Sequence, residues 1–386
     1  MRITDVRAAV VGKEEPHSGG SVWTFVRVYT DEGIVGTGEC NSAGWYTGFA
    51  VKSTVIALRE LVVGADPLAP GPLMETLRRR GRYGGGSSAP VSFALTGIET
   101  ALYDIAGKAL GVPVSTLLGG RYRDEIALYA DSEAGAEDTV ASIREKALTV
   151  IAEGYKALKF DADHMGSFRD DWNYHPSAAH LDHIVKMVYA IREAIGPEID
   201  LAIDCHGHFD LPTATTLARE LEPARLLFLE DPVADESVDA MAQINASSST
   251  PVCTGEDFYF RHSFLELFEK RAVSVVMPDI TKAGGLAELK RIAELAHTFA
   301  IPISPHNVSS PLGMMAGCHV MASVPNFLYL EFHGREIEWW SDLCDGEKPF
   351  LADGAMRVSD APGIGVELND AVARTFLWNG DAYFDD

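Results

Sequence analysis

Cysteine is scarce in this sequence: there are five among 386 residues, and they show no paired spacing. An odd number without a repeated spacing is not the pattern of a small secreted protein held together by disulfides. Most of these cysteines also lie inside strand-like runs. We therefore expect reduced thiols and a cytoplasmic location.

Long apolar runs are also missing. No segment approaches the roughly 20 consecutive apolar residues that a membrane-spanning helix needs. The first residues, MRITDVRAAVVGKEEP, contain neither a long apolar stretch nor a small-residue cleavage pattern. The sequence therefore predicts a protein without a membrane span and without a secretion signal.

Basic residues are few, with 32 Lys and Arg against 56 Asp and Glu, which gives a formal net charge of -24. A charge of this sign repels nucleic acids and anionic lipid head groups, so neither is an expected partner. Hydrophobic residues still make up 47% of the chain. That share is enough for a sizeable buried core.

Residues 1–124 have the pattern of an α+β domain. Strand-like runs come first, and apolar residues at helical spacing follow. The strands are expected at 3–11, 22–30 and 34–40, and the helices at 54–63, 72–83 and 94–111. Residues 348–386 look like a hairpin tail that returns to pack on this domain.

Residues 125–347 alternate between strand-like and helix-like runs. The strand candidates are 126–131, 157–162, 201–206, 226–231, 251–257, 273–279, 301–306 and 327–332. Alternation on this scale specifies a parallel sheet, and eight such units close into a (β/α)₈ TIM barrel. The expected fold class is therefore α/β: a barrel with an α+β capping domain formed by the N-terminal segment and the tail.

Functional side chains stand at the end of every expected strand from the second onward. They are Lys159, Asp161, Asp204, His206, Glu230, Glu256, Asp279, His306 and Glu331. Each acid alone could cap the helix that follows it. Capping does not explain the whole set, whereas barrel active sites are built at the carboxyl ends of the strands.

Asp204, Glu230 and Glu256 follow one another at intervals of 26 residues, about one strand-helix unit, so they should lie on neighbouring strands. Their carboxylates offer the oxygen ligands that Mg²⁺ prefers, whereas zinc would favour more histidine or cysteine. A cation there can stabilise the enediolate that forms when the carbon next to a carboxylate loses its proton. We therefore expect a Mg²⁺ site.

His306 is the candidate base, and Asp279, one strand earlier, is placed to orient its ring. His306 could instead be a buried ring bonded to backbone. His206 lies two residues beyond Asp204, so it should face the same chamber and can serve as an acid. Lys159 either lies near a substrate carboxylate or forms a buried ion pair with the adjacent acids.

These residues resemble the enolase superfamily, and within it the mandelate racemase subgroup, over nearly the whole chain. Its metal ligands are matched by Asp204, Glu230 and Glu256. Its Asp-His dyad is matched by Asp279 and His306, and its last-strand acid is matched by Glu331. The last-strand acid is implied to bond the substrate carboxylate or the enediolate. The resemblance also implies that loops 14–21 and 41–49 of the capping domain close over the substrate.

The second strand departs from the family pattern. Mandelate racemases and several relatives carry Lys-x-Lys there, whereas this chain reads Lys159-Phe160-Asp161. A racemase needs an acid and a base on opposite faces of the substrate, so mandelate racemization is not expected. Asp204-Cys205-His206 instead resembles the galactonate and gluconate dehydratases, in which this histidine protonates the departing β-hydroxyl.

The resemblance predicts a Mg²⁺-dependent hydro-lyase that converts a sugar acid of the aldonate type into a 2-keto-3-deoxy acid. One alternative is a cycloisomerase of an anhydro-sugar acid or sugar lactone, which uses the same half-reaction. An epimerase is a third, and it would need Lys159 or a residue of the 161–182 insert as the opposing catalyst. A remote alternative is a non-catalytic, metal-stabilised protein that binds a metabolite.

Substrate contacts are expected mainly from the capping loops and from the insert at 161–182. The candidates are Asp161, Trp45, Tyr46, Arg82 and His333. Exposed aromatic residues in loops are as often subunit contacts. The chain length within this family indicates a homo-oligomer, with a small sugar acid as its other partner.

Overall fold

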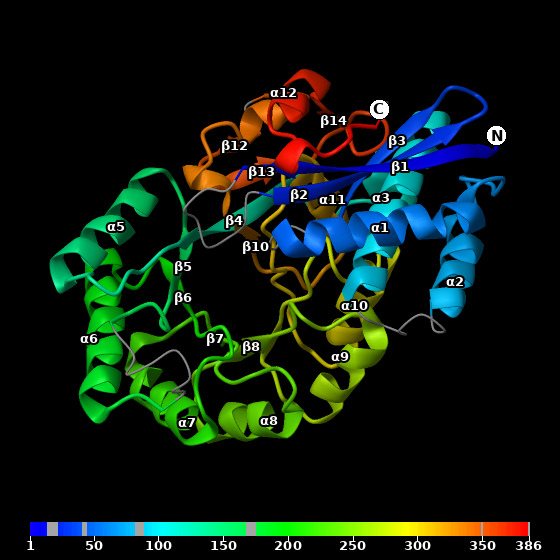
Figure 1. The fold of residues 1–386 in the computed structure, drawn as a ribbon. Helices are drawn as coiled ribbons and strands as arrows, with labels where there is room; N and C mark the ends of the chain where they lie inside the picture. The colour runs from blue at the N-terminus through cyan, green and yellow to red at the C-terminus, as the bar shows by residue number, and fades with distance from the viewer. Residues whose placement is uncertain (14–21, 41–44, 82–88, 167–174, 349, 385–386) are drawn as a thin grey trace.

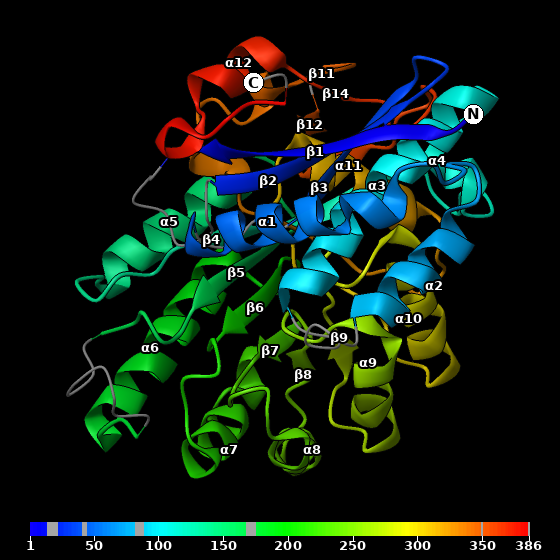
Figure 2. The same ribbon diagram turned by 45° about the vertical axis from the view of Figure 1, so that its right-hand side comes forward.

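The computed structural model describes residues 1–13, 22–40, 45–81, 89–166, 175–348 and 350–384. Figure 1 and Figure 2 show an α/β barrel with an α+β domain lying across one end of it. The predicted barrel with a capping domain is therefore confirmed. Within the described ranges, none of the helices has the length and apolar character to cross a bilayer.

The capping domain begins with an antiparallel sheet in the order β1-β2-β3. Its strands are β1 (Ile3–Gly12), β2 (Val22–Thr30) and β3 (Val35–Cys40), and its helices are α1 (Trp45–Val62), α2 (Pro70–Gly81), α3 (Ala89–Leu110) and α4 (Val114–Leu117). The first three helices begin earlier than predicted. Glycine lets α3 approach β3 closely: a Cβ at Gly38 would lie 2.1 Å from the Gly97 carbonyl oxygen.

The barrel strands are parallel and follow chain order from β4 to β9. They are β4 (Glu125–Ser132), β5 (Ala157–Asp161), β6 (Asp200–Asp204), β7 (Phe228–Glu230), β8 (Val252–Thr254), β9 (Val275–Val276) and β10 (Leu330–Phe332). β10 pairs with β4 and closes the barrel. Around the strands in Figure 1 lie α5 (Val140–Ala152), α6 (Ala178–Ile195), α7 (Leu211–Glu220), α8 (Val238–Ser247), α9 (Phe260–Glu269), α10 (Leu286–Thr298) and α11 (Pro311–Ala322).

The seventh predicted strand, 301–306, is reduced to one bridging residue. Ile303 pairs in parallel with Val276 on one side and with Phe327 on the other. Pro302 and Pro305 flank it, and proline has no amide hydrogen for a sheet ladder. The barrel therefore keeps eight positions around its wall, although the seventh is not a regular strand.

Side-chain caps fix where several barrel helices begin. The residues whose side chains accept a backbone hydrogen bond at the start of α5, α6, α7, α8 and α11 are Thr139, Ser177, Asp210, Ser237 and Ser310. Each satisfies an amide that has no partner inside its helix. The turns that follow the barrel strands are therefore defined by local sequence.

The tail differs in part from the prediction. Its hairpin, β12 (Leu351–Ala352) and β13 (Ala355–Arg357), pairs antiparallel with β4 of the barrel. β11 (Cys344–Asp345), which precedes the hairpin, pairs with β14 (Glu367–Leu368), and α12 (Asp370–Thr375) follows β14. The hairpin packs on the barrel because the amino-terminal half of β4 offers a free edge, since β10 covers only Leu128–Ala130.

Residues beyond the hairpin do contact the capping domain. The Ile364 amide donates to Asp104 of α3 at 3.0 Å, and Lys52 of α1 pairs with Asp381 at 2.6 Å. Both views show the red C-terminal segment with α12 beside the blue strand β1 (Figures 1 and 2). The domain boundaries at 124 and 347 remain predictions.

Buried polar side chains of the capping domain hold two barrel loops. Glu99 of α3 accepts a hydrogen bond from the Ala287 amide at 2.9 Å. Glu39 of β3 accepts one from the Ser310 amide at 3.0 Å. These loops follow β9 and the Ile303 position, so the capping domain fixes the two segments that begin with Asp279 and His306.

Candidate active site

The three predicted metal-binding acids lie at the carboxyl ends of consecutive strands. The pairing register aligns Asp161 with Asp204 across β5 and β6, and Asp204 with Glu230 across β6 and β7. Glu256 follows β8, the next strand. The even spacing of these acids in the sequence thus becomes one row along the barrel rim.

Five acids at this rim form a cluster with the chemical character of a divalent cation site. The members of this acid cluster are Asp161, Asp204, Glu230, Asp231 and Glu256. Ligand atoms lie within 4.8 Å of one another in two groups, Asp161, Asp204 and His206, and Glu230, Asp231 and Glu256. Among the described residues, Oε1 of Glu230 is buried without a hydrogen-bond partner. Burial and the charge of Asp204 raise the pKa of Glu230 well above its usual range. A hard cation would satisfy this oxygen and offset the repulsion, so the residues fit such an ion.

Lys159 lies inside the acid cluster. Its Nζ is 3.0 Å from Asp204 Oδ2, 2.9 Å from Glu230 Oε2 and 2.6 Å from Glu331 Oε1, and the side chain is 2% exposed. Burial alone would lower the pKa of Lys159, but the carboxylates of Glu230 and Glu331 outweigh it and raise the pKa well above the usual range. Lys159 was expected either near a substrate carboxylate or in a buried ion pair with the adjacent acids, and the structure favours the ion pair.

His306 and Asp279 lie in direct contact. His306 Nδ1 is 2.6 Å from Asp279 Oδ2, and the other ring nitrogen, Nε2, is 2.9 Å from Glu256 Oε2. Asp279 is fully buried, and its Oδ1 accepts hydrogen bonds from the amide and hydroxyl of Thr281 at 2.6 and 2.8 Å. The alternative that His306 is bonded only to backbone is therefore wrong. With Nδ1 held by Asp279, Nε2 faces the acid cluster.

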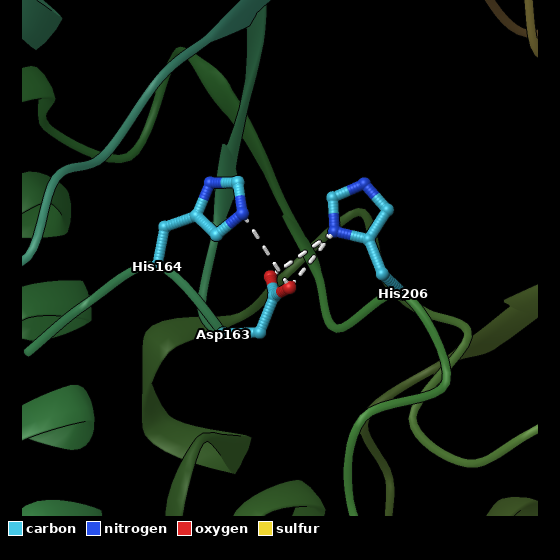
Figure 3. Close-up of side chains that lie close together, drawn as sticks. All are labelled: Asp163, His164 and His206. Atoms are coloured by element: carbon cyan, nitrogen blue, oxygen red, sulfur yellow. Dashed lines mark hydrogen bonds and ion pairs between the residues drawn. The ribbon is translucent and has the colours of Figure 1, made fainter. Parts of the chain in front are cut away.

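His206 lies across the barrel from His306, because β6 and the Ile303 position are four places apart in the ring of eight. β6 ends at Asp204, and His206 has a left-handed backbone with φ of 44°. A turn, and not the strand alternation assumed from the sequence, therefore directs its ring. The ring Nε2 lies 3.7 Å from Asp204 Oδ2, and Nδ1 lies 3.1 Å from Asp163 Oδ1 (Figure 3).

The charge of Asp204 raises the pKa of His206 to about 11, against an opposing effect of burial and with further help from Asp163. The two carboxylates thus favour the protonated form of the His206 ring. A protonated imidazole on the rim opposite His306 has the charge state required of a proton donor.

Glu331 joins the cluster from the last strand. Its Oε2 accepts a hydrogen bond from the Asn307 amide at 3.0 Å, and its Oε1 lies 3.0 Å from His333 Nε2. His333 Nδ1 lies 3.3 Å from Asp131 Oδ2. The predicted substrate contact His333 is thus in the chamber, where its ring bridges two carboxylates.

Sequence reasoning missed Asp131 and Asp163. Asp131 ends the first expected strand in IALYAD, a position equivalent to the others that were recognised. Asp163 lies two residues after Asp161 and contacts His206. The spacing Asp161-Ala162-Asp163 was the available signal, but nothing in the local sequence specified the partner.

A cleft of about 630 Å³ opens beside the acid cluster. Its lining includes His206, Asp210, Asp231, Asp235, Glu256 and Asp257. This space suits a small molecule. Its acidic lining repels an anion, so an anionic ligand would need a cation in the cluster to be held there.

Several predicted substrate contacts are not placed. Arg82 and residues 167–174 of the 161–182 insert lie outside the described residues. So do residues 14–21 and 41–44 of the two capping loops. Trp45 and Tyr46 begin α1, but the structure describes only their backbone and not their side chains. The roles of these residues stay predictions. The structure places the other two candidates, Asp161 and His333, beside the acids of the rim.

Two protein families match the chain. Residues 142–372 match the family described as enolase C-terminal domain-like. Residues 18–119 match the N-terminal domain of mandelate racemase / muconate lactonizing enzyme. The two matches cover most of the barrel with part of the tail, and most of the capping domain.

Similar proteins point to one type of reaction. The chain is 38% identical over 386 residues to a D-xylonate dehydratase of Haloferax volcanii, covering 100% of this chain and 91% of the relative. It is 35% identical over 353 residues to a D-galactonate dehydratase of Xanthomonas campestris, covering 90% of this chain and 89% of the relative.

Solved structures share the whole fold. A mandelate racemase/muconate lactonizing enzyme-like protein from Rubrobacter xylanophilus has a TM-score of 0.92 and 40% identity, covering 99% of both chains. The 3,6-anhydro-D-galactonate cycloisomerase from Zobellia galactanivorans has a TM-score of 0.86 and 26% identity, covering 98% of this chain and 100% of the other.

Proposed function

The chain belongs to the mandelate racemase/muconate lactonizing enzyme group of the enolase superfamily and is a sugar-acid dehydratase, and we propose that its substrate is an aldonic acid of the D-xylonate or D-galactonate type. The product would be the 2-keto-3-deoxy acid. The observation that carries this proposal is the placement of two histidines on opposite sides of one acid cluster. His306 is held by Asp279, and His206 is held by Asp163 beside Asp204.

Members of this superfamily use a divalent metal ion, and Asp204, Glu230 and Glu256 are the residues that would hold it here. The unpartnered oxygen of Glu230 and the oxygen-rich donor set favour Mg²⁺. When bound, the ion supplies positive charge for the substrate carboxylate and makes the neighbouring C–H bond more acidic.

His306 removes the proton from C2 of the substrate. Nδ1 is bonded to Asp279 at 2.6 Å, so the neutral ring carries its proton on Nδ1 and its lone pair on Nε2, which lies 2.9 Å from the proposed metal ligand Glu256. The electrons of the C–H bond move into the carboxylate and form an enediolate. Glu331 is the residue that would contact the substrate carboxylate or the enediolate, and its own charge is offset by Lys159 at 2.6 Å.

His206 completes the elimination from the opposite side. As the electrons return to form the C2–C3 double bond, the C3–O bond breaks and His206 gives its proton to the departing hydroxyl, which leaves as water. The resulting enol takes up a proton on C3 and becomes the 2-keto-3-deoxy acid. His306 and His206 thus have separate tasks, and variants of each should fail at different steps.

The experiment compares His306→Asn and His206→Asn on a panel of aldonic acids with Mg²⁺ in deuterated water. His306→Asn should lose about 10²- to 10⁴-fold in turnover and also lose exchange of the C2 proton. His206→Asn should lose dehydration while retaining that exchange. His262→Asn, at an exposed position on α9, is the matched control. Wild-type turnover by His306→Asn would refute the assignment of the base.

A cycloisomerase is the second candidate, because the 3,6-anhydro-D-galactonate cycloisomerase of Zobellia galactanivorans shares the whole fold. The base would be the same and the leaving group would be a ring oxygen. Mass spectrometry separates the two, since dehydration loses one water and cycloisomerisation conserves mass. An epimerase is less well supported, because Lys159 is tied to three carboxylates.

A further inference from the structure

We propose that Asp163 is a positioning residue for His206, which fixes the ring so that Nε2 faces the substrate chamber. The inference rests on the proposed dehydratase function and adds to it a residue outside the predicted set. It makes the acid side of the site a second Asp-His pair, opposite Asp279 and His306. Figure 3 shows the three side chains concerned, Asp163, His164 and His206.

The geometry of the pair is well defined. Both carboxylate oxygens of Asp163 contact the same nitrogen, Nδ1 of His206, at 3.1 and 3.2 Å. The Asp163 side chain is only 9% exposed. The other ring nitrogen, Nε2, is left 3.7 Å from Asp204 Oδ2, at the edge of the acid cluster. The carboxylate therefore selects which nitrogen points inward.

His206 needs such a partner because little else fixes its ring. Its side chain is 43% exposed, and its backbone has already left β6. The backbone itself is held, since the His206 amide donates to Asp204 Oδ1 at 2.9 Å and the Gly207 amide donates to the Asp231 carbonyl at 2.7 Å. An imidazole on a fixed backbone can still turn over about its last torsion and exchange its ring edges. A hydrogen bond to Nδ1 prevents that.

Within the described part of its loop, the Asp163 carboxylate shows no task other than its contacts with the rings of His206 and His164. Among the described residues, no backbone amide donates a hydrogen bond to its carboxylate. The loop is held by other bonds: the Ala162 amide donates to the Asp204 carbonyl at 2.7 Å, and the Met165 amide donates to the Ala162 carbonyl at 3.1 Å. Replacement of Asp163 should therefore leave the loop folded, which makes its effect on His206 measurable.

His164 tests the competing view that the three residues hold a soft metal ion. Its Nε2 is 3.7 Å from Asp163 Oδ2, and its ring centroid is 5.8 Å from that of His206. Two imidazoles and a carboxylate can bind a transition metal, and in that case both histidines would matter equally. The shorter contact to His206 favours the Asp-His pair, in which His164 is dispensable.

The experiment uses the full-length Mg²⁺-loaded protein and an aldonic acid that the wild type dehydrates in the panel above. Asp163→Asn is expected to lower kcat for dehydration about 10- to 100-fold with KM nearly unchanged, while C2 proton exchange in deuterated water is retained. The ratio of exchange to elimination then rises, as for His206→Asn. Asp163→Glu should recover part of kcat, and His164→Asn should remain within about threefold of wild type.

Nitrogen NMR of the histidine rings gives a readout independent of turnover. The His206 signals are assigned by their loss in His206→Asn, and in Asp163→Asn the Nδ1 signal should shift. Equal loss of exchange and elimination in Asp163→Asn, or no change in either, would overturn the positioning role. If either of these outcomes is found while the wild type dehydrates an aldonic acid, only the positioning role of Asp163 is refuted. If the wild type dehydrates no aldonic acid, the proposed function itself is refuted. Matching losses in His164→Asn and Asp163→Asn would favour the metal site instead.

Discussion

Glu39 of the capping domain lies 3.0 Å from the Ser310 amide and caps helix α11 of the barrel, 271 residues away in sequence. The same carboxylate accepts a hydrogen bond from the Gly313 amide at 3.0 Å and one from the Ser310 hydroxyl. Helix α11 follows the segment that begins with His306. The capping domain therefore supports the position of the proposed base as well as covering the chamber.

Glu39→Ala should destabilise the protein and slow catalysis. Two amides at the start of α11 would lose a buried acceptor, which costs roughly 1–3 kcal/mol for each buried group left unsatisfied. Urea unfolding should therefore show a lower free energy of unfolding, and kcat should fall as the loop of His306 loosens. Glu60→Ala, at an exposed position on α1, is the control. Unchanged stability in Glu39→Ala would contradict the capping role.

Asp279→Asn should impair the first step of the reaction. Asparagine can still accept the bond from Thr281, but its amide can donate to His306 Nδ1 and so favour the wrong tautomer. We expect turnover and C2 proton exchange to fall together by about 10²- to 10⁴-fold. This outcome differs from that of Asp163→Asn, where exchange is retained. Retained C2 proton exchange in Asp279→Asn would contradict the assignment of Asp279 and His306 as the catalytic dyad.

Removal of divalent cations should abolish dehydration and lower thermal stability. An ion that binds only the folded protein stabilises it by about 2.7 kcal/mol at a concentration 100 times its Kd. Added Mg²⁺ should therefore raise Tm in a thermal-shift assay of the chelated protein, and Na⁺ at matched ionic strength should not. Glu230→Gln should lose the Mg²⁺-dependent rise. A wild-type Tm that does not change on addition of Mg²⁺ would contradict the proposed metal site.

His319 should make the protein sensitive to acid. It is fully buried on α11, where Nδ1 accepts a hydrogen bond from the Ser115 amide at 3.3 Å and Nε2 donates to the Ile364 carbonyl at 2.9 Å. Burial lowers the pKa of His319 from 6.5 to about 4. Because the folded pKa lies below the unfolded one, its contribution to stability is present above about pH 6.5 and is lost as the pH falls through about 4.

A shift of this size corresponds to about 3 kcal/mol, at about 1.4 kcal/mol for each pKa unit. His319→Gln removes the titrating ring, so the free energy of unfolding of the variant should fall less steeply between pH 6.5 and 4. Chemical denaturation at several pH values measures the difference. Parallel curves for the two proteins would show that His319 does not titrate in this way.

Much of the barrel follows from the sequence, because strand and helix patterns are local. The runs that contain β4 to β10 were all predicted, and the family resemblance agrees with the fold. The local sequence pattern did not predict the structure where pairing with a strand distant in sequence decides it. Pro302 and Pro305 reduce the seventh strand to a bridge at Ile303, and the tail hairpin joins β4 because an edge is free there.

The sequence by itself determined the row of Asp204, Glu230 and Glu256 and the neighbouring pair of Asp279 and His306, because residues at the ends of successive parallel strands must meet at one rim. Tertiary structure alone decided that Lys159 is enclosed by carboxylates and that Asp163 meets His206, 43 residues along the chain. The reason is physical. Strand spacing sets which residues share a rim, whereas the directions of side chains on the loops depend on how separate turns pack against each other.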